Sequence, residues 1–158
     1  MAGVLVVGAS GYLGGAVARE LRESGRLVAG TCCSTRTPES DVRFDVWTDD
    51  AGVLADEHDV DAVVFAAAVE YGGEADTGAT GANPSFEQVL ERFARGCRDS
   101  RLVYVSSAAV FDGQRGNDSE DADRSPVDDY GRRRGPGLRT LRGLRDTADE
   151  LPVRCQRR

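Results

Sequence analysis

The sequence predicts an α/β fold with a doubly wound parallel sheet, on three observations. Short runs rich in β-branched residues alternate with amphipathic segments between residues 4 and 106, in the order β-α-β-β-α-β-α-β. The run at 60–68 is almost continuously apolar, as expected for a strand with helices on both faces. The first run leads into three glycines with the spacing G-x-x-G-x-x-G, which joins a strand to a helix in such folds.

The first strand is expected at 4–7 and the first helix at 12–24, before the stop signal Gly25. Glycines between them let the backbone turn tightly and let a ligand approach, and the free N–H groups at the helix start attract an anion. This predicts a Rossmann-type site for a dinucleotide pyrophosphate; the alternative is a glycine-rich turn that binds nothing. The predicted site comprises Gly8, Ser10, Gly11, Tyr12, Leu13 and Gly14.

A second strand is expected at 27–31, and the residues after it bear on the choice of cofactor. In the NAD-binding version of this unit, an acidic residue near the strand end accepts hydrogen bonds from the adenosine ribose. Here residues 32–36 contain no acid, and the first acidic side chain is Glu39. Arg36, which follows two hydroxyl residues, suits a 2′-phosphate through its charge and its forked donors. We therefore expect NADP rather than NAD, with an ordinary solvated loop residue as the alternative for Arg36.

The next two strands are expected at 42–46 and 60–68, separated by a helix that begins after the acidic residues at 48–50. Asp45, near the end of the first of these strands, is a candidate for contacting the adenine amino group. The alternative for Asp45 is a strand-end carboxylate without a ligand. The second strand ends in three small residues, which would leave space for the cofactor against the backbone: Ala66, Ala67 and Ala68.

Three further elements follow along the chain. Residues 70–83 are rich in Gly, Glu, Thr and Asp, which predicts a long loop. Residues 84–98 carry their apolar side chains on one helical face, and residues 101–106 form an apolar run that leads into hydroxyl residues. We expect a helix and then a strand.

Composition limits the class of protein. At 158 residues, of which 40% are hydrophobic, the chain fits one domain with an ordinary core. Its net charge of −7 disfavours nucleic acid and anionic membranes as partners. No apolar run approaches the roughly 20 residues that span a bilayer, and no leader precedes the first strand, so we expect a cytoplasmic protein. The four cysteines and one histidine lack metal-ligand spacing, so we expect reduced thiols and no metal site.

Charge is distributed unevenly along the chain. Residues 1–130 hold 11 arginines against 24 acidic residues, whereas residues 131–158 hold 9 arginines against 3 acidic residues. The two segments differ in composition as strongly as two unrelated proteins do. A boundary is therefore expected near residue 130.

Three motifs, in this order, carry a family resemblance: G-A-S-G-Y-L-G-G at 8–15, V-Y-V-S-S-A-A-V-F-D-G at 103–113 and S-P-V-D-D-Y-G-R at 125–132. With them the chain resembles the N-terminal part of an extended short-chain dehydrogenase/reductase, in the dTDP-4-dehydrorhamnose reductase and sugar-nucleotide epimerase branch. The resemblance covers residues 1 to about 132. It implies a nicotinamide cofactor on the glycine turn and hydride transfer at a sugar carbon of a nucleotide-sugar substrate.

By position in these motifs, the resemblance implies that Ser107 hydrogen-bonds the substrate oxygen and that Tyr130 donates or accepts the proton. A phenol has a pKa of about 10, so this chemistry needs a nearby positive charge. The family places a lysine four residues after the tyrosine, one helical turn away. This chain has Arg134 there, which keeps the charge but cannot present a compact ammonium to both the phenol and the ribose.

After Tyr130 we expect the chain to depart from the family. The ring of Pro136 would clash with the carbonyl of Arg132, so the helix should stop and Tyr130 should be held poorly. We expect a dinucleotide-binding domain at 1–130, an atypical Arg-rich tail at 131–158 and no substrate domain, with the sheet incomplete at its C-terminal end. An out-of-frame reading of the gene from near codon 131 would explain such a tail.

Two functions are left open by these observations. The first is an NAD(P)-dependent reductase or epimerase that acts on a nucleotide sugar, with turnover that depends on Tyr130. The second is a catalytically inactive dinucleotide-binding remnant or module, destabilised by an unpaired sheet edge, which binds the cofactor at most.

Overall fold

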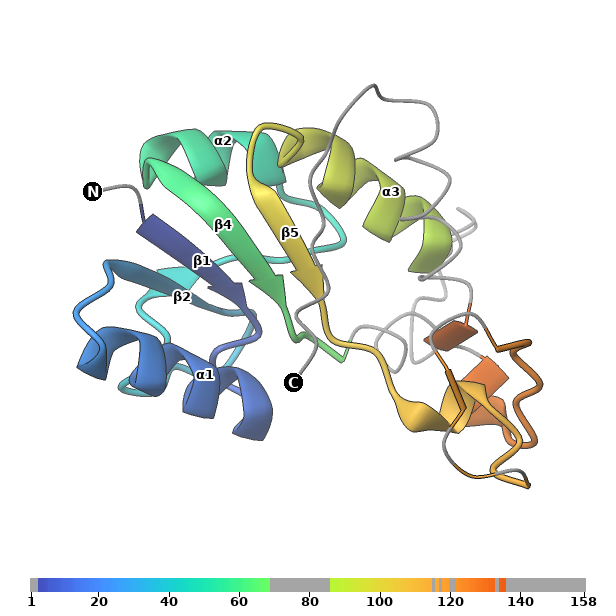
Figure 1. The fold of residues 1–158 in the computed structure, drawn as a ribbon. Helices are drawn as coiled ribbons and strands as arrows, with labels where there is room; N and C mark the ends of the chain where they lie inside the picture. Colours follow the sequence, from blue (N-terminus) through green and yellow to red (C-terminus); the bar gives the residue numbers. More distant parts are fainter. Residues whose placement is uncertain are drawn as a thin grey trace.

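The computed structural model describes residues 3–68, 86–114, 116, 118–119, 122–132 and 134–135. Five strands form in chain order: β1 (Gly3–Val7), β2 (Val28–Cys32), β3 (Val42–Arg43), β4 (Val60–Phe65) and β5 (Arg101–Tyr104). The helices are α1 (Tyr12–Glu23), α2 (Ala51–Glu57), α3 (Phe86–Gly96) and the short 3₁₀ helix η2 (Ala108–Val110). The predicted order of elements is confirmed (Figure 1). The loop expected at 70–83 and the tail from residue 136 onward lie outside the described residues.

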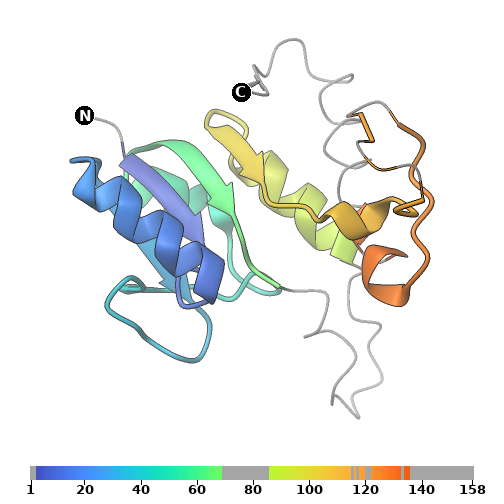
Figure 2. The ribbon, with the colours of Figure 1, turned by 60° about the horizontal axis from the view of Figure 1, so that its bottom comes forward.

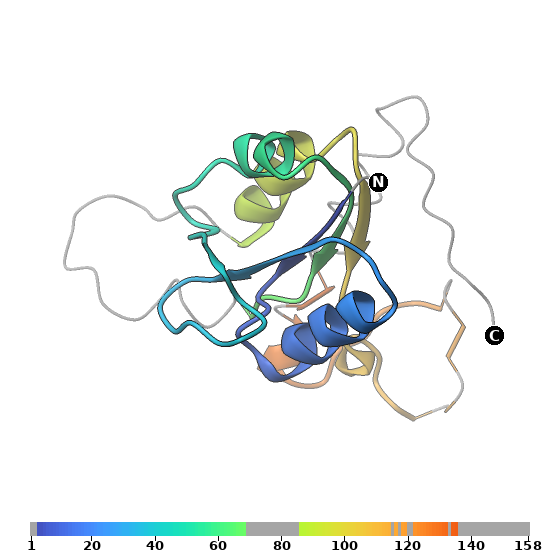
Figure 3. The same cartoon turned by 90° about the vertical axis from the view of Figure 1, so that its left-hand side faces the viewer.

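The five strands are parallel and form one sheet in the order β3-β2-β1-β4-β5. Helix α1 covers one face of the sheet, and α2 and α3 cover the other (Figure 1, Figure 3). This confirms the doubly wound α/β fold. The chain leaves β1 toward β2 on one side and continues from β4 to β5 on the other, so the topology reverses between β1 and β4. Ligands of open α/β sheets bind outside the carboxyl ends of the strands at such a point.

Side chains of β1 and β4 alternate between two apolar clusters, one on each face of the sheet. In the larger cluster, the ring of Phe65 on β4 packs edge-on against Phe93 of α3, with 4.9 Å between the ring centroids. In the smaller cluster, Val4 and Val6 of β1 pack with Ala18 of α1. The two central strands are therefore held from both sides, which fixes the position of their carboxyl ends.

Three strands, those expected at 42–46, 60–68 and 101–106, are shorter than predicted, and a local turn explains the first. The strand expected at 42–46 ends at Arg43, because Asp45 folds the chain back. One carboxylate oxygen of Asp45 accepts the N–H of Trp47 at 2.9 Å, and the N–H of Asp45 donates to Asp49 at 2.7 Å. The strand expected at 60–68 ends at Phe65, and the helix expected at 84–98 ends at Gly96. In the described part of the chain, no helix has the length and apolar character that crossing a membrane requires.

Candidate functional site

The turn between β1 and α1 lies at the carboxyl edge of the sheet, where the topology reverses (Figure 2). Gly8 has a φ of +87°, a conformation that side-chain-bearing residues rarely adopt. A Cβ on Gly8 would lie 2.8 Å from the Cα of Ala67, and a Cβ on Gly14 would overlap the carbonyl oxygen of Gly8. These glycines let strand, turn and helix meet at backbone distance. The third predicted glycine, Gly11, hydrogen-bonds through its N–H to the carbonyl of Gly8 at 3.0 Å.

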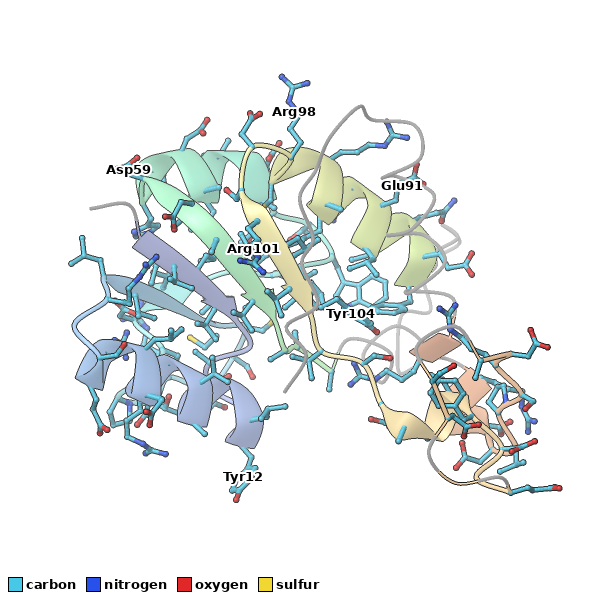
Figure 4. The ribbon with its side chains drawn as sticks, viewed as in Figure 1. Tyr12, Asp59, Glu91, Arg98, Arg101 and Tyr104 are labelled. Carbon is cyan, nitrogen blue, oxygen red and sulfur yellow. The ribbon has the colours of Figure 1, made fainter. Side chains whose placement is uncertain are left out.

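The first turn of α1 presents backbone donors without a side-chain acceptor. Gly11 is the N-cap residue, and no side chain caps the helix. The side chain of Tyr12 is 99% exposed and points away from the sheet, and Leu13 is also exposed (Figure 4). The N–H groups at a helix start carry the positive end of the helix dipole, so this turn suits an anion such as a phosphate.

Strand β2 supports the turn through Thr31, which the sequence reasoning missed. The buried Oγ1 of Thr31 accepts the N–H of Gly8 at 3.1 Å, and its carbonyl accepts the N–H of Ser10 at 3.3 Å. A hydroxyl residue within an apolar strand is a weak signal, because many such residues pack without a role. Its partner became visible only in the folded chain.

An open pocket lies between the start of α1 and the loop that follows β2. The loop is closed by Ser40, whose buried hydroxyl accepts the N–H of Thr37 at 2.7 Å. Arg36, predicted to bind a 2′-phosphate, is an exposed residue of the same loop and forms no ion pair within the described residues. The polar and turn residues that line the pocket are Ser10, Gly11, Tyr12, Arg19, Thr37 and Glu39.

The remaining predicted cofactor residues lie around this edge. Asp45 is half-buried beside the end of β2, and its charge adds to the burial that raises the pKa of the Cys33 thiol. Its carboxylate already closes the turn to Trp47, as described above. The N–H of Ala66 donates to the carbonyl of Val7 at 2.9 Å, and Ala67 packs against Gly8. Ala68 is exposed just beyond them.

Ser107 and Tyr130 lie on two segments that contact each other beyond the carboxyl end of β5 (Figure 1). Ser107 is the N-cap of η2, and its Oγ accepts the N–H of Ala109 at 3.2 Å. A Cβ on Gly131 would overlap the carbonyl oxygen of Ala109. The residue directly after Tyr130 therefore packs backbone to backbone on the helical turn that Ser107 caps. Gly131 is a further residue of this site that the sequence reasoning did not single out.

Arg134 is only 8% exposed and faces both Tyr130 and β5. Its guanidinium carbon lies 5.5 Å from the centroid of the Tyr130 ring. Its Nη1 donates to the carbonyl of Val105 at 3.1 Å and lies 3.5 Å from the hydroxyl of Tyr104. Residues 129–132 and 134–135 are helical. Pro136 lies outside the described residues.

Two observations concern metal ligands and thiols in the part of the chain that the structure describes. No group of three His, Cys, Asp or Glu side chains there could hold a metal ion. Cys32, Cys33 and Cys97 are free thiols, and Cys155 lies outside the described residues. The candidate site is therefore an edge with an anion-binding turn, a basic and hydroxyl-bearing loop, and a serine–tyrosine–arginine group.

Comparison with known proteins places this edge in a family. The model of the RmlD substrate binding domain matches residues 1–145. The chain belongs to the RmlD substrate-binding-domain family. The match runs past the last motif at 125–132, and so past the boundary expected near residue 130. A curated relative is the "Probable low-salt glycan biosynthesis reductase Agl14" of Haloferax volcanii, which is 32% identical over 155 residues. The alignment covers 90% of this chain and 50% of that protein, so the chain spans about half the length of this relative.

Solved structures agree with the family assignment. A hypothetical dTDP-4-dehydrorhamnose reductase from Sulfolobus tokodaii is 25% identical with a TM-score of 0.68, over 87% of this chain and 51% of that one. MoeE5, in complex with UDP-glucose and NAD, is 25% identical with a TM-score of 0.68, over 90% of this chain and 48% of that one. UDP-glucuronic acid 4-epimerase from Bacillus cereus, 19% identical with a TM-score of 0.67, shares the fold over 90% of this chain and 52% of its own. The resemblance to the reductase and epimerase branch is confirmed.

Proposed function

We propose that this chain is the cofactor-binding part of an NADP-dependent oxidoreductase that transfers a hydride at the carbonyl carbon of a nucleotide sugar. The observation that carries the proposal is the uncapped start of α1 on a glycine turn, at the point where the sheet topology reverses. Ser107 and Tyr130, on two segments that contact each other, lie beyond the carboxyl end of β5, the strand next to β4. A dinucleotide bound along this edge would extend from the first group toward the second.

The residues present fit such a cofactor. The Gly8 and Gly14 backbones are packed so tightly that a Cβ at either would overlap its neighbours, and the turn therefore offers bare backbone. The N–H groups at the start of α1 would hold the pyrophosphate. Arg36, exposed after β2, would pair with the 2′-phosphate that distinguishes NADP from NAD. When bound, the nicotinamide supplies or accepts the hydride.

The chain's own residues supply the proton chemistry. Hydride transfer to a carbonyl leaves an alkoxide that must be protonated, and the hydroxyl of Tyr130 is the group proposed to do this. Ser107 would hydrogen-bond the same substrate oxygen. Arg134 provides a positive charge at the Tyr130 ring and is itself fixed to the carbonyl of Val105. The ligands of a structural neighbour support the coarser part of the proposal: MoeE5 is in complex with UDP-glucose and NAD, and the Haloferax volcanii relative is named a reductase.

Two measurements test the proposal. Calorimetric titration is expected to detect NADPH binding and weaker NADH binding, with the preference reduced in Arg36→Gln. Turnover is expected when a 4-keto nucleotide sugar and NADPH are mixed. Tyr130→Phe should lower kcat by about 10²- to 10⁴-fold, because the proton donor is removed while the ring that faces Arg134 remains.

Ser107→Ala is expected to lower turnover, whereas Ser106→Ala serves as the matched control. The Ser106 hydroxyl is buried and makes no hydrogen bond to a described residue, so its removal should leave both binding and turnover unchanged. If neither dinucleotide binds, the proposed function is wrong. An unchanged rate in Tyr130→Phe removes Tyr130 from the mechanism.

A catalytically inactive dinucleotide-binding module is the second candidate, and the placement of Arg134 favours it. Its guanidinium is hydrogen-bonded to the β5 end and lies by the tyrosine ring, where the family carries a lysine. A planar fork fixed in this way is not equivalent to a mobile ammonium. If the wild-type chain binds NADPH without turnover, and Arg134→Lys restores turnover, the second candidate is established for the wild type.

A further inference from the structure

We infer that Arg19 of α1 is, beside Arg36, a second determinant of the preference for NADP over NAD, and that the carboxylate of Glu39 weakens this preference. The inference rests on the proposed function and deepens it. Arg19 is seven residues after Tyr12, which places both on the same side of α1, the side that lines the open pocket. Arg19 is the basic residue among the described residues that line the pocket, whereas Arg36 lies outside the lining.

The loop after β2 reaches Arg19 because of Gly30. A Cβ on Gly30 would overlap the carbonyl oxygen of Glu39, so glycine in β2 lets the loop backbone cross the strand closely. The Cγ of Glu39 then lies 4.0 Å from a Cβ built on Gly15. The loop thus turns the Glu39 carboxylate against α1, at the level of Arg19.

Arg19 and Glu39 form an ion pair that a stronger anion can displace. Their Nη1–Oε1 distance is 3.5 Å, and the Arg19 side chain is 58% exposed. The Glu39 side chain is only 22% exposed, so the solvated partner is Arg19. Because the two groups meet only at the limit of hydrogen-bond distance, the pair contributes little free energy, and the exposed Arg19 side chain can leave it at small cost. A phosphate dianion offers more charge and two acceptors for the fork.

The position of the pocket identifies the phosphate. A dinucleotide whose pyrophosphate lies on the start of α1 directs its adenosine ribose toward the end of β2. The pocket lies between these two elements and also holds Ser10 and Thr37 as hydroxyl residues. The ribose 2′ position therefore lies within reach of Arg19, and a carboxylate at Glu39 opposes a 2′-phosphate by charge. The 2′-hydroxyl of NADH would instead donate a hydrogen bond to the carboxylate of Glu39. A preference for NADH is therefore the competing outcome.

The test is the dissociation constant of NADPH and of NADH for the wild type and four variants. Arg19→Gln is expected to weaken NADPH binding about ten-fold and NADH binding less than about two-fold. Arg19→Lys should retain most of the NADPH affinity. Glu39→Gln is expected to strengthen NADPH binding about three-fold or more, because the opposing charge is removed.

Arg22→Gln is the matched control, because Arg22 also extends from α1 to an acidic loop residue, Asp41, at 3.3 Å, but lies outside the pocket lining. It should leave both dissociation constants unchanged, and thermal melting checks that every variant is folded. If Arg19→Gln loses affinity for NADPH and NADH equally, or Glu39→Gln loses only NADH binding, this inference is wrong and the proposed function still stands. If the wild type binds neither nucleotide, the proposed function and this inference are both wrong.

Discussion

Arg134 supplies a positive charge beside Tyr130 in a form that differs from a lysine ammonium. A lysine ammonium is a point charge on a flexible stem, whereas a guanidinium is a planar group with fixed donor directions. Here one of those donors binds the carbonyl of Val105, and the guanidinium carbon lies 5.5 Å from the Tyr130 ring centroid. The contact is within the range of a cation–π interaction, which orients the ring. Arg134 therefore anchors Tyr130 to β5, which a sequence comparison of residue types would not reveal.

The buried thiol of Cys97 makes the stability of the protein depend on pH. Its thiol is buried after α3, and burial, followed by the charges of Asp50 and Asp56, raises the pKa of Cys97 to about 12 from 9.0. The folded protein therefore keeps this thiol protonated at a pH where the unfolded chain ionises it. Stability from this group is intact below about pH 9 and is lost as the pH rises from about 9 to about 12.

We expect Cys97→Ala to remove this part of the pH dependence. Urea unfolding of the wild type and the variant at about pH 8 and about pH 10.5 measures it. The wild type should lose up to about 1.4 kcal/mol more per pH unit than the variant above pH 9. The comparison of slopes cancels the cost of the small cavity that the substitution leaves. Parallel pH profiles for the two proteins would show that Cys97 does not titrate differently on unfolding.

At the scale of elements, hydrophobic periodicity predicted which strands and helices form, but not how they pack against one another. The apolar runs and helical spacings located the eight main strands and helices within a few residues, because burial imposes those patterns locally. The strand at 42–46 was overestimated, since the turn closed by Asp45 depends on hydrogen bonds that apolar patterning does not encode. The approach of Glu39 to Arg19 depends on Gly30, which reads as an ordinary residue of an apolar strand. Contacts between distant segments need the fold.

The contact between the Tyr130 segment and η2 is the element packing on which the proposed chemistry depends. Gly131→Ala would drive a methyl group into the carbonyl of Ala109 and separate the two segments. Overpacking of this kind lowers the free energy of unfolding by about 1 to 3 kcal/mol. Turnover should fall with it, because Tyr130 and Ser107 would no longer be held together, while NADPH affinity should persist.

Gly135→Ala is the matched control for this change. A Cβ on Gly135 meets no described residue within 4 Å, and alanine is the better helix former by up to about 1 kcal/mol. Denaturant unfolding should therefore show Gly135→Ala to be as stable as the wild type or more so. Equal stability and turnover in both variants would mean that the close approach at Gly131 does not position the tyrosine.

At the scale of the whole molecule, the sheet links the proposed cofactor site, at the carboxyl ends of β1 and β4, to the core. The residues of β1 and β4 alternate between the two apolar clusters, so their carboxyl ends, which carry the glycine turn and Ala66 to Ala68, depend on packing from both faces. The sequence predicted this architecture because alternation and topology follow from burial. It did not predict the support given by Thr31 or the contact made by Gly131, because both arise from the meeting of segments far apart in the chain.

This linkage predicts that a core substitution and cofactor binding have opposite effects on the free energy of unfolding. Phe93→Ala removes the ring that packs on Phe65 and is expected to lower the free energy of unfolding by about 3 to 5 kcal/mol. Val53→Ala, at an exposed position of α2, is the control and should change it by less than about 0.5 kcal/mol. NADPH at 100 times its dissociation constant should return about 2.7 kcal/mol to Phe93→Ala, because the ligand binds the folded chain alone. Denaturant unfolding with and without NADPH measures both terms. Stabilisation of the wild type but not of Phe93→Ala would show that the variant's folded state has lost the cofactor edge.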